Sequence, residues 1–193
     1  GTVLCVSCWN QADQTSYTFC KEDGVDPEEL QSIADHFGEI DKHQAQDLGY
    51  QLLPGDEWLS QPVDILIPAA LENQITARSV QDISPRVKFV AEGANGPTTP
   101  AADRVLTEKN VTIIPDMLAN AGGVISSYFE QVQSNENYYW QKDEVLGQLD
   151  VKMTSAYVEV SNFAREHELP FREAAYAIAV ERVARACADR GWV

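Results

Sequence analysis

The chain has 193 residues, of which 44% are hydrophobic, and both values are typical of a soluble globular protein. Its formal charge of −16, from 30 acidic and 14 basic residues, gives nucleic acid or anionic lipid little electrostatic reason to bind. The longest apolar stretches, such as residues 63–71, are too short to cross a bilayer. The composition therefore argues against a nucleic-acid-binding protein and against a membrane protein.

The four cysteines are few and scattered, which fits a reducing cytoplasm. Cys5 and Cys8 have the spacing of a Cys-x-x-Cys site, but an offset of three residues within a strand sends the two side chains to opposite faces. Cys20 and Cys187 supply no second pair with zinc-like spacing. We therefore expect ordinary strand packing at Cys5 and Cys8 rather than a redox or metal site.

The first part of the chain predicts one strand and one helix. Residues 2–6 are short, apolar and partly β-branched, as in a strand, and a polar loop is expected from there to about Val25. Asp26 followed by proline and two glutamates then predicts a helix start. This helix should turn Leu30, Ile33 and Phe37 inward and end near Gly38.

Three further strands are predicted at residues 63–68, 87–91 and 111–114. Each is a continuous apolar run, and helix-like segments at 76–83 and 100–108 separate them. Continuous rather than alternating hydrophobicity indicates that both faces of each strand are covered. The pattern predicts an α/β fold with a parallel sheet between helical layers.

After Asn120 the pattern is helical throughout. Apolar residues recur there at spacings of three and four, which predicts a buried stripe: Leu146, Leu149, Met153, Ala156, Tyr157, Val160, Phe163 and Ala164. A last helix is expected over 171–190, ending at Gly191, with the following residues buried: Tyr176, Ala179, Val180, Val183 and Cys187.

The loops that follow the three central strands carry small residues and one asparagine each. They comprise residues 68–73, 92–100 and 115–123. Small residues let a flat ring approach the backbone, and an asparagine both donates and accepts hydrogen bonds. Turn chemistry alone explains any one such loop. Three of them at successive strand ends, where α/β sheets bind ligands, favour a pocket for a carboxamide or a ribose.

These loops are also where the chain resembles the glutamate dehydrogenases, in "VDILIPAALENQIT", "VAEGANGPTTPAADRVL" and "IPDMLANAGGVISSYFEQVQ". The resemblance runs from about Asp23 to Trp192 and weakens between His36 and Trp58. In the related leucine and phenylalanine dehydrogenases the "GPTTP" run is lacking. The resemblance implies a Rossmann-like, doubly wound and mostly parallel sheet that lacks its first strand and is followed by C-terminal helices. A partial dinucleotide-binding domain over 1–133 and a helical segment over 134–193 are expected.

Carried over by position, the resemblance assigns cofactor-binding residues. It implies that Ala69, Ala70 and Asn73 line a nicotinamide dinucleotide, NAD or NADP, and that Asn95 contacts its nicotinamide-ribose end. Asn120 would lie beside the nicotinamide at the start of a helix, whose exposed N–H groups favour anionic or amide ligands.

Val124 and Ser127 match the substrate-side positions of the family. Ser127 would donate a hydrogen bond to the side-chain carboxylate of glutamate, and the branched-chain relatives have an apolar residue there. A hydroxyl that loses its partner costs about 1–3 kcal/mol, so such a site favours glutamate over leucine. The alternative is a helix serine that bonds back to the preceding turn.

The implied activity is reversible oxidative deamination of L-glutamate to 2-oxoglutarate and ammonia, by a parent enzyme that is commonly a hexamer. In the family, the glycine-rich phosphate loop and the catalytic lysines and aspartate precede the matched region, so we expect a C-terminal piece that is inactive alone. Cys8 stands near the position of the acid that binds the ribose 2′-hydroxyl, which leaves NAD against NADP open. A non-catalytic regulatory module and a branched-chain amino-acid dehydrogenase are the alternatives.

Overall fold

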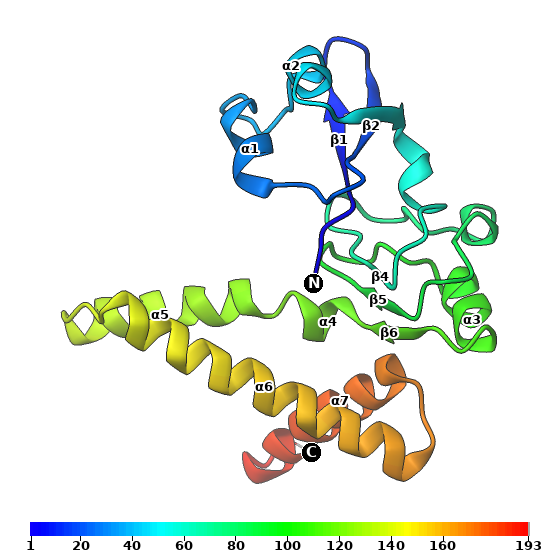
Figure 1. Cartoon of the computed structure of the whole chain (residues 1–193). Helices are drawn as coiled ribbons and strands as arrows, with labels where there is room; N and C mark the ends of the chain where they lie inside the picture. The colour runs from blue at the N-terminus through cyan, green and yellow to red at the C-terminus, as the bar shows by residue number, and fades with distance from the viewer. Residues whose placement is uncertain (193) are drawn as a thin grey trace. The chain divides into compact units, whose positions relative to one another are not determined.

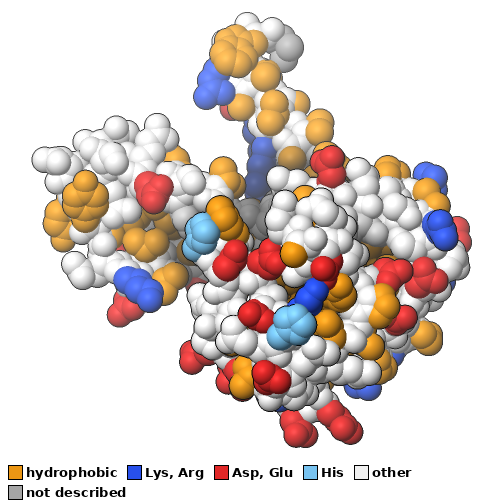
Figure 2. All heavy atoms as spheres, turned by 90° about the horizontal axis from the view of Figure 1, so that it is seen from above, with side chains coloured by type: hydrophobic (Ala, Val, Ile, Leu, Met, Phe, Trp, Pro, Cys, Tyr) orange, Lys and Arg blue, Asp and Glu red, His pale blue; other side chains and the backbone are white. Residues whose placement is uncertain are grey.

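The structure is a computed structural model that describes residues 1–192. Its residues form two compact units, one of residues 1–64 with 81–87 and the other of residues 65–80 with the chain from Lys88 onward. Acidic side chains are spread over the face drawn in Figure 2 rather than gathered in one place. Among the described residues, no helix combines the length and the apolar character needed to cross a bilayer.

The first unit contains an antiparallel sheet of β1 (Cys5–Asn10), β2 (Thr15–Cys20) and β3 (Gln51–Pro54), in that order. The polar loop predicted up to Val25 is therefore wrong. Its middle forms β2, because threonine, tyrosine and phenylalanine are side chains that favour strands even where the segment is polar. The first strand begins later than predicted and pairs antiparallel with β2, so it is not part of the parallel sheet.

Two short helices accompany this sheet. The predicted helix start is confirmed: α1 (Pro27–Ser32) begins after Asp26, whose side chain accepts hydrogen bonds from the backbone of Glu28 and Glu29. The helix ends at Ser32 rather than near Gly38, and Phe37 is 84% exposed. The second helix, α2 (Lys42–Asp47), is capped in the same way by Asp41, and a 3-10 turn, η1 (Gly55–Trp58), follows β3.

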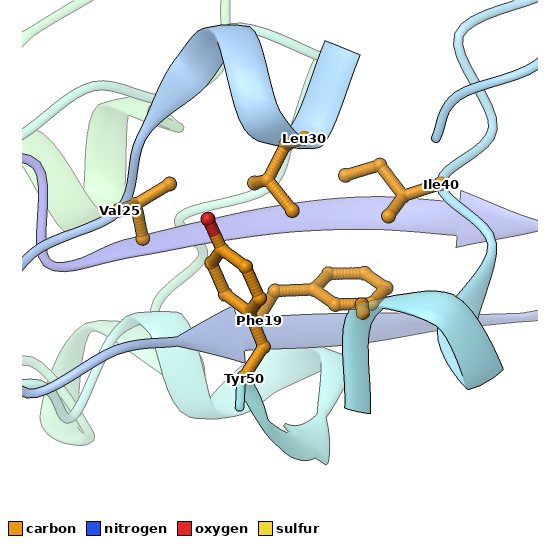
Figure 3. Packing of buried hydrophobic residues seen from close by; sticks show 6 residues of the cluster. Phe19, Val25, Leu30, Ile40 and Tyr50 are labelled. Atoms are coloured by element: carbon orange, nitrogen blue, oxygen red, sulfur yellow. The ribbon is translucent and has the colours of Figure 1, made fainter. Parts of the chain in front are cut away.

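The core of the first unit lies between these helices and the sheet. Figure 3 shows Val25, Leu30 and Ile40 directed toward the rings of Phe19 and Tyr50. The Tyr50 hydroxyl donates a hydrogen bond to the partly exposed Glu29 at 2.6 Å, so this polar atom has a partner at the edge of the cluster.

The second unit contains the predicted parallel sheet, formed by β4 (Ile65–Leu66), β5 (Phe89–Ala91) and β6 (Thr112–Ile114). The three strands lie side by side in chain order (Figure 1). The helix predicted over 100–108 is confirmed as α3 (Pro100–Glu108), which Thr99 caps. The helix-like segment at 76–83 forms only the short 3-10 turn η2 (Ser79–Gln81).

The rest of this unit is helical, as predicted. It comprises α4 (Asp116–Ala119), α5 (Gly122–Glu136), α6 (Lys142–His167) and α7 (Phe171–Asp189). The helices α6 and α7 pack against each other, and the cluster between them and α4 is made of six buried residues: Leu118, Val160, Ala164, Ala174, Ala175 and Ile178. Of the stripe predicted on α6, Val160 and Ala164 are buried, whereas Leu146 and Tyr157 are exposed.

The buried face predicted for the last helix is wrong. Tyr176, Val180 and Val183 are 55–65% exposed, and the buried side chains are those of Ala174, Ala175 and Ile178. Apolar residues occur on more than one face of α7, so their spacing alone does not identify the packed face. The packed face is the one with Ala174 and Ala175, whose small side chains let α6 approach closely. Gly191, with φ of +67°, follows the end of the helix as expected.

An ion-pair network ties the start of α7 to the sheet. Arg172 binds Glu92 at 2.8 Å, Asp103 at 2.6 Å and Asp116 at 3.4 Å, and the Glu92 side chain has no exposed surface. Burial on its own lowers the pKa of Arg172, but the hydrogen bonds and charges of Glu92 and Asp103 more than offset it and hold the pKa above its ordinary value. We refer to these four residues as the Arg172 network.

Replacing Arg172 with methionine is expected to lower the free energy of unfolding by about 3–5 kcal/mol, because it leaves the buried Glu92 carboxylate without its cation. Urea unfolding followed by the helical circular dichroism signal measures the loss. The control is Arg182→Met, since the ion pair of Arg182 with Glu159 is exposed and its loss should cost less than about 1 kcal/mol. Equal losses in the two variants would contradict a central role for the Arg172 network.

Candidate functional site: three linked loops at the carboxyl edge of the parallel sheet

The three asparagine-bearing loops leave the carboxyl ends of β4, β5 and β6, which is the edge where parallel sheets bind ligands. Backbone hydrogen bonds join the first two loops: Ala94 N donates to Pro68 O at 2.9 Å, and Asn73 N donates to Gly96 O at 2.9 Å. Side chains join the second and third loops. The structure therefore brings the three loops together, as the sequence predicts.

Asn95 and Asn120 form the side-chain link. The amide nitrogen of Asn120 donates to the amide oxygen of Asn95 at 2.8 Å and to the carbonyl oxygen of Gly93 at 3.3 Å. Asn95 is exposed and Asn120 is half-buried. The pair leaves one amide donor on Asn95 and one amide acceptor on Asn120 that bond to no other described residue. A carboxamide ligand needs one such donor and one such acceptor.

Because the residues here are small, no large side chain projects from this surface. Ala69 and Ala70 are exposed, and a Cβ atom added to Gly93 would lie 3.1 Å from the Cβ atom of Ala69. The backbones of the first two loops therefore approach each other as closely as side chains permit. A flat ring can lie against a surface of this kind without meeting a large side chain.

Asn73 has a left-handed backbone conformation, with φ of +55°. Asparagine adopts this conformation more readily than most residues because its short side chain bonds locally. Its side chain is exposed, and its backbone N–H is the group that binds the neighbouring loop. In this structure, the local role of Asn73 is to turn the first loop toward the second.

Asn120 lies between two helices rather than at the first residue of one. It ends α4, and α5 begins two residues later at Gly122 without a side-chain cap. The first N–H groups of α5 consequently have no side chain of their own helix to satisfy them. They add a partial positive charge next to Asn120, as expected for a helix start that favours an amide or an anion.

Val124 and Ser127 lie on the first turns of α5. Val124 is 70% exposed, and Ser127 is exposed as well. The Ser127 hydroxyl donates to the carbonyl oxygen of Gly123 at 3.2 Å, which is the back-bonded arrangement considered above. Ser126 makes the same contact with Gly122 at 2.9 Å but is half-buried. Of the two, Ser127 is thus the serine open to a ligand.

The Arg172 network also holds the loops in place. The backbone N–H of Asp116 donates to Glu92 at 2.8 Å, and the Asp116 side chain accepts from the backbone N–H of Gly96 at 2.9 Å. Glu92 is the first residue of the second loop and Asp116 the second residue of the third, so Arg172 supports both from outside the loops. The sequence alone does not indicate the role of Arg172, because it lies 56 residues after Asp116 and 80 after Glu92.

Hollows elsewhere in this unit do not include the three asparagines. One of about 420 Å³ lies between α6 and α7 beside Glu159, Arg182 and Arg185, and another of about 260 Å³ lies beside Thr107 and Phe171. The asparagine loops form an exposed surface rather than a hollow. Among residues 1–192, no group of His, Cys, Asp and Glu side chains is arranged to hold a metal ion.

Comparison with known proteins gives consistent relatives. The NAD-specific glutamate dehydrogenase of Clostridioides difficile is 38% identical over 192 residues, which cover 100% of this chain and 44% of that protein. The NAD-specific glutamate dehydrogenase of Staphylococcus aureus (strain COL) is 40% identical over 169 residues, 88% of this chain and 39% of that protein. The chain therefore spans less than half the length of these relatives.

Solved structures agree with the fold. Glutamate dehydrogenase from Peptoniphilus asaccharolyticus superposes with a TM-score of 0.78 at 35% identity, covering 100% of this chain and 42% of its own. A hetero-hexameric glutamate dehydrogenase from Thermus thermophilus, in a leucine-bound form, gives 0.79 at 25% identity, covering 90% and 39%. The family model for Glutamate/Leucine/Phenylalanine/Valine dehydrogenase matches residues 11–191. With the parallel sheet and its linked loops, this match shows that the chain belongs to the Glutamate/Leucine/Phenylalanine/Valine dehydrogenase family.

Proposed function

We propose that the chain forms the cofactor wall and part of the substrate pocket of an NAD-dependent glutamate dehydrogenase, which interconverts L-glutamate with 2-oxoglutarate and ammonia. The observation that carries this proposal is the Asn95–Asn120 pair on three linked loops at the carboxyl edge of a parallel sheet. The parallel strands β4, β5 and β6 would then belong to a Rossmann-like, doubly wound sheet that is followed by C-terminal helices.

The cofactor side of the proposal rests on small and amide side chains. Ala69 and Ala70 leave room for the dinucleotide, and Asn73 turns its loop toward this surface. Asn95 would donate to the nicotinamide-ribose end, and Asn120 would orient the carboxamide. When bound, NAD supplies the acceptor for the hydride, and these residues supply only position and hydrogen bonds.

We favour NAD over NADP because both compared sequence relatives are named NAD-specific. The sequence alone leaves this choice open, since Cys8 stands near the position of the acid expected to bind the ribose 2′-hydroxyl.

We also propose that the parent enzyme is a homo-oligomer, a hexamer in the simplest case. The Thermus thermophilus relative is hetero-hexameric, which supports an assembly of six subunits, although its subunits are not all identical.

On the substrate side, Val124 and Ser127 would border glutamate. The Ser127 hydroxyl can leave the Gly123 carbonyl and donate to the side-chain carboxylate, a charge-assisted bond that is stronger than the one it gives up. The leucine side chain has no hydrogen-bond acceptor for the Ser127 hydroxyl. The exposure of Ser127 in this structure gives such a substrate direct access.

The experiment that tests the proposed activity joins this chain to the complementary, amino-terminal part of the Clostridioides difficile relative. The chimera is expected to reduce NAD in the presence of glutamate, with a higher kcat/KM than for leucine. The 193-residue chain alone is expected to give no turnover. A chimera that folds but prefers leucine would favour the branched-chain alternative, and one that folds, binds NADH and has no activity would favour a regulatory module.

Replacing Asn120 with alanine in the chimera is expected to weaken NADH binding about 5- to 30-fold, because it removes the two hydrogen bonds that hold the Asn95–Asn120 pair in place, with a combined contribution of about 1–2 kcal/mol. Fluorescence titration with NADH measures the effect. Asn95→Ala should weaken binding too, and the double variant should lose less than the sum, since the two side chains act as a pair. Asn162→Ala, on the exposed face of α6, is the control, and additive effects would argue against the pair.

Replacing Ser127 with valine is expected to lower kcat/KM for glutamate about 10- to 100-fold while leaving leucine unchanged or improved, because only glutamate loses a hydrogen-bond partner. Steady-state kinetics with both amino acids measures the change. Ser126→Val is the matched control, since Ser126 makes the same contact with its own helix. A similar fall in both variants would mean that the hydroxyl matters to α5 rather than to the substrate.

A further inference from the structure

Cys5 and Cys20 lie directly opposite each other at one end of the β1–β2 pair. The adjacent position is closed by a hydrogen bond from Lys21 N to Leu4 O at 3.3 Å. Because bonded and non-bonded pairs alternate along an antiparallel ladder, Cys5 and Cys20 form a non-hydrogen-bonded pair, with Cα atoms typically about 4.5 Å apart. This separation lies within the range of about 4.4–6.8 Å over which two cysteines can be bridged.

The two side chains also point at each other. Their sulfur atoms are 2.7 Å apart, both thiols are free, and Cys20 is only 9% exposed while Cys5 is half-buried. The sulfur of Cys8, the other cysteine of the Cys-x-x-Cys spacing, lies 3.4 Å from the carbonyl oxygens of both Gly38 and Trp9. Its offset of three from Cys5 along β1 sends it to the other face of the sheet, as predicted.

The surroundings of the pair favour the thiol over the thiolate. Burial, together with the contact to Cys20, raises the pKa of Cys5 to about 12. Burial also raises the pKa of Cys20; the contact with Cys5 offsets part of this rise, and the negative charge of Glu57 adds to it. Since the thiolate is the reactive form, the pair reacts more slowly in the folded chain than an exposed cysteine would.

We propose that Cys5 and Cys20 form a reversible disulfide by exchange with a low-molecular-weight disulfide such as oxidised glutathione. One cysteine thiolate attacks the glutathione disulfide and releases one glutathione. The second thiolate attacks the mixed disulfide at the cysteine sulfur and releases the other. The glutathione S–S bond breaks and the Cys5–Cys20 bond forms. Two electrons pass from the cysteine sulfurs to glutathione, and the two thiol protons end on the two glutathione thiols.

This site is independent of the proposed dehydrogenase activity, because it uses only the sheet of the first unit. Its expected consequence is a covalent link across 15 residues of chain, which ties β1 to β2 and constrains the unfolded state. The bond would be lost in excess reduced glutathione. The fraction of chains with the Cys5–Cys20 bond would therefore depend on the ratio of oxidised to reduced glutathione.

The test refolds the 193-residue chain from urea in a mixture of oxidised and reduced glutathione, so that slow attack on buried thiols does not limit the outcome. After quenching with an alkylating agent, mass spectrometry of the intact chain and of its peptides identifies the bonds. We expect one species in which Cys5 is bonded to Cys20 while Cys8 and Cys187 are alkylated. Added dithiothreitol should return all four thiols.

Two variants complete the test. Cys8→Ser should give the same Cys5–Cys20 bond in the same yield, and Cys20→Ser should give no intramolecular bond. The proposal is overturned if the wild-type chain keeps four free thiols in the oxidising mixture, if it yields mainly Cys5–Cys8, or if glutathione remains attached at Cys5 and Cys20. Circular dichroism of each product confirms that the compared chains have the same secondary structure.

Discussion

The ion pair between Arg172 and the buried carboxylate of Glu92 is the interaction on which the candidate site most depends. Glu92 begins one asparagine-bearing loop and accepts a hydrogen bond from the backbone of Asp116, near the start of the next. Asp116 in turn accepts from Gly96. A single cation from α7 thereby fixes two loops whose own sequences are short and rich in small residues. Without such support, open loops of this composition would have many alternative conformations.

The sequence predicts those parts of the fold in which local pattern and packing agree. The continuous apolar runs before residues 68, 91 and 114 identify the parallel strands, and Asp26 and Thr99 identify two helix starts through their capping side chains. The failures have a common cause. Strand β2 mixes strand-favouring side chains with polar ones, and the apolar residues of α7 lie on several faces, so in both places contact with the partner element decides the outcome.

The candidate site likewise has features that the sequence predicts and features that it does not. The convergence of Asn73, Asn95 and Asn120 follows from sequence because the ends of parallel strands share one edge of a sheet. The support from Arg172 and the pairing of Cys5 with Cys20 do not follow. Each joins residues that are adjacent only after folding: one contact spans 80 residues, and the other depends on the register of a strand that the sequence did not reveal.

The approach of Gly93 to Ala69 has a consequence for how this family can vary. Gly93 can gain a side chain only if Ala69 gives way, because a Cβ atom at Gly93 would lie 3.1 Å from the Cβ atom of Ala69. A larger residue at position 93 should therefore be accepted together with glycine at position 69. The spacing between these loops thus depends on the pair of residues rather than on either one alone.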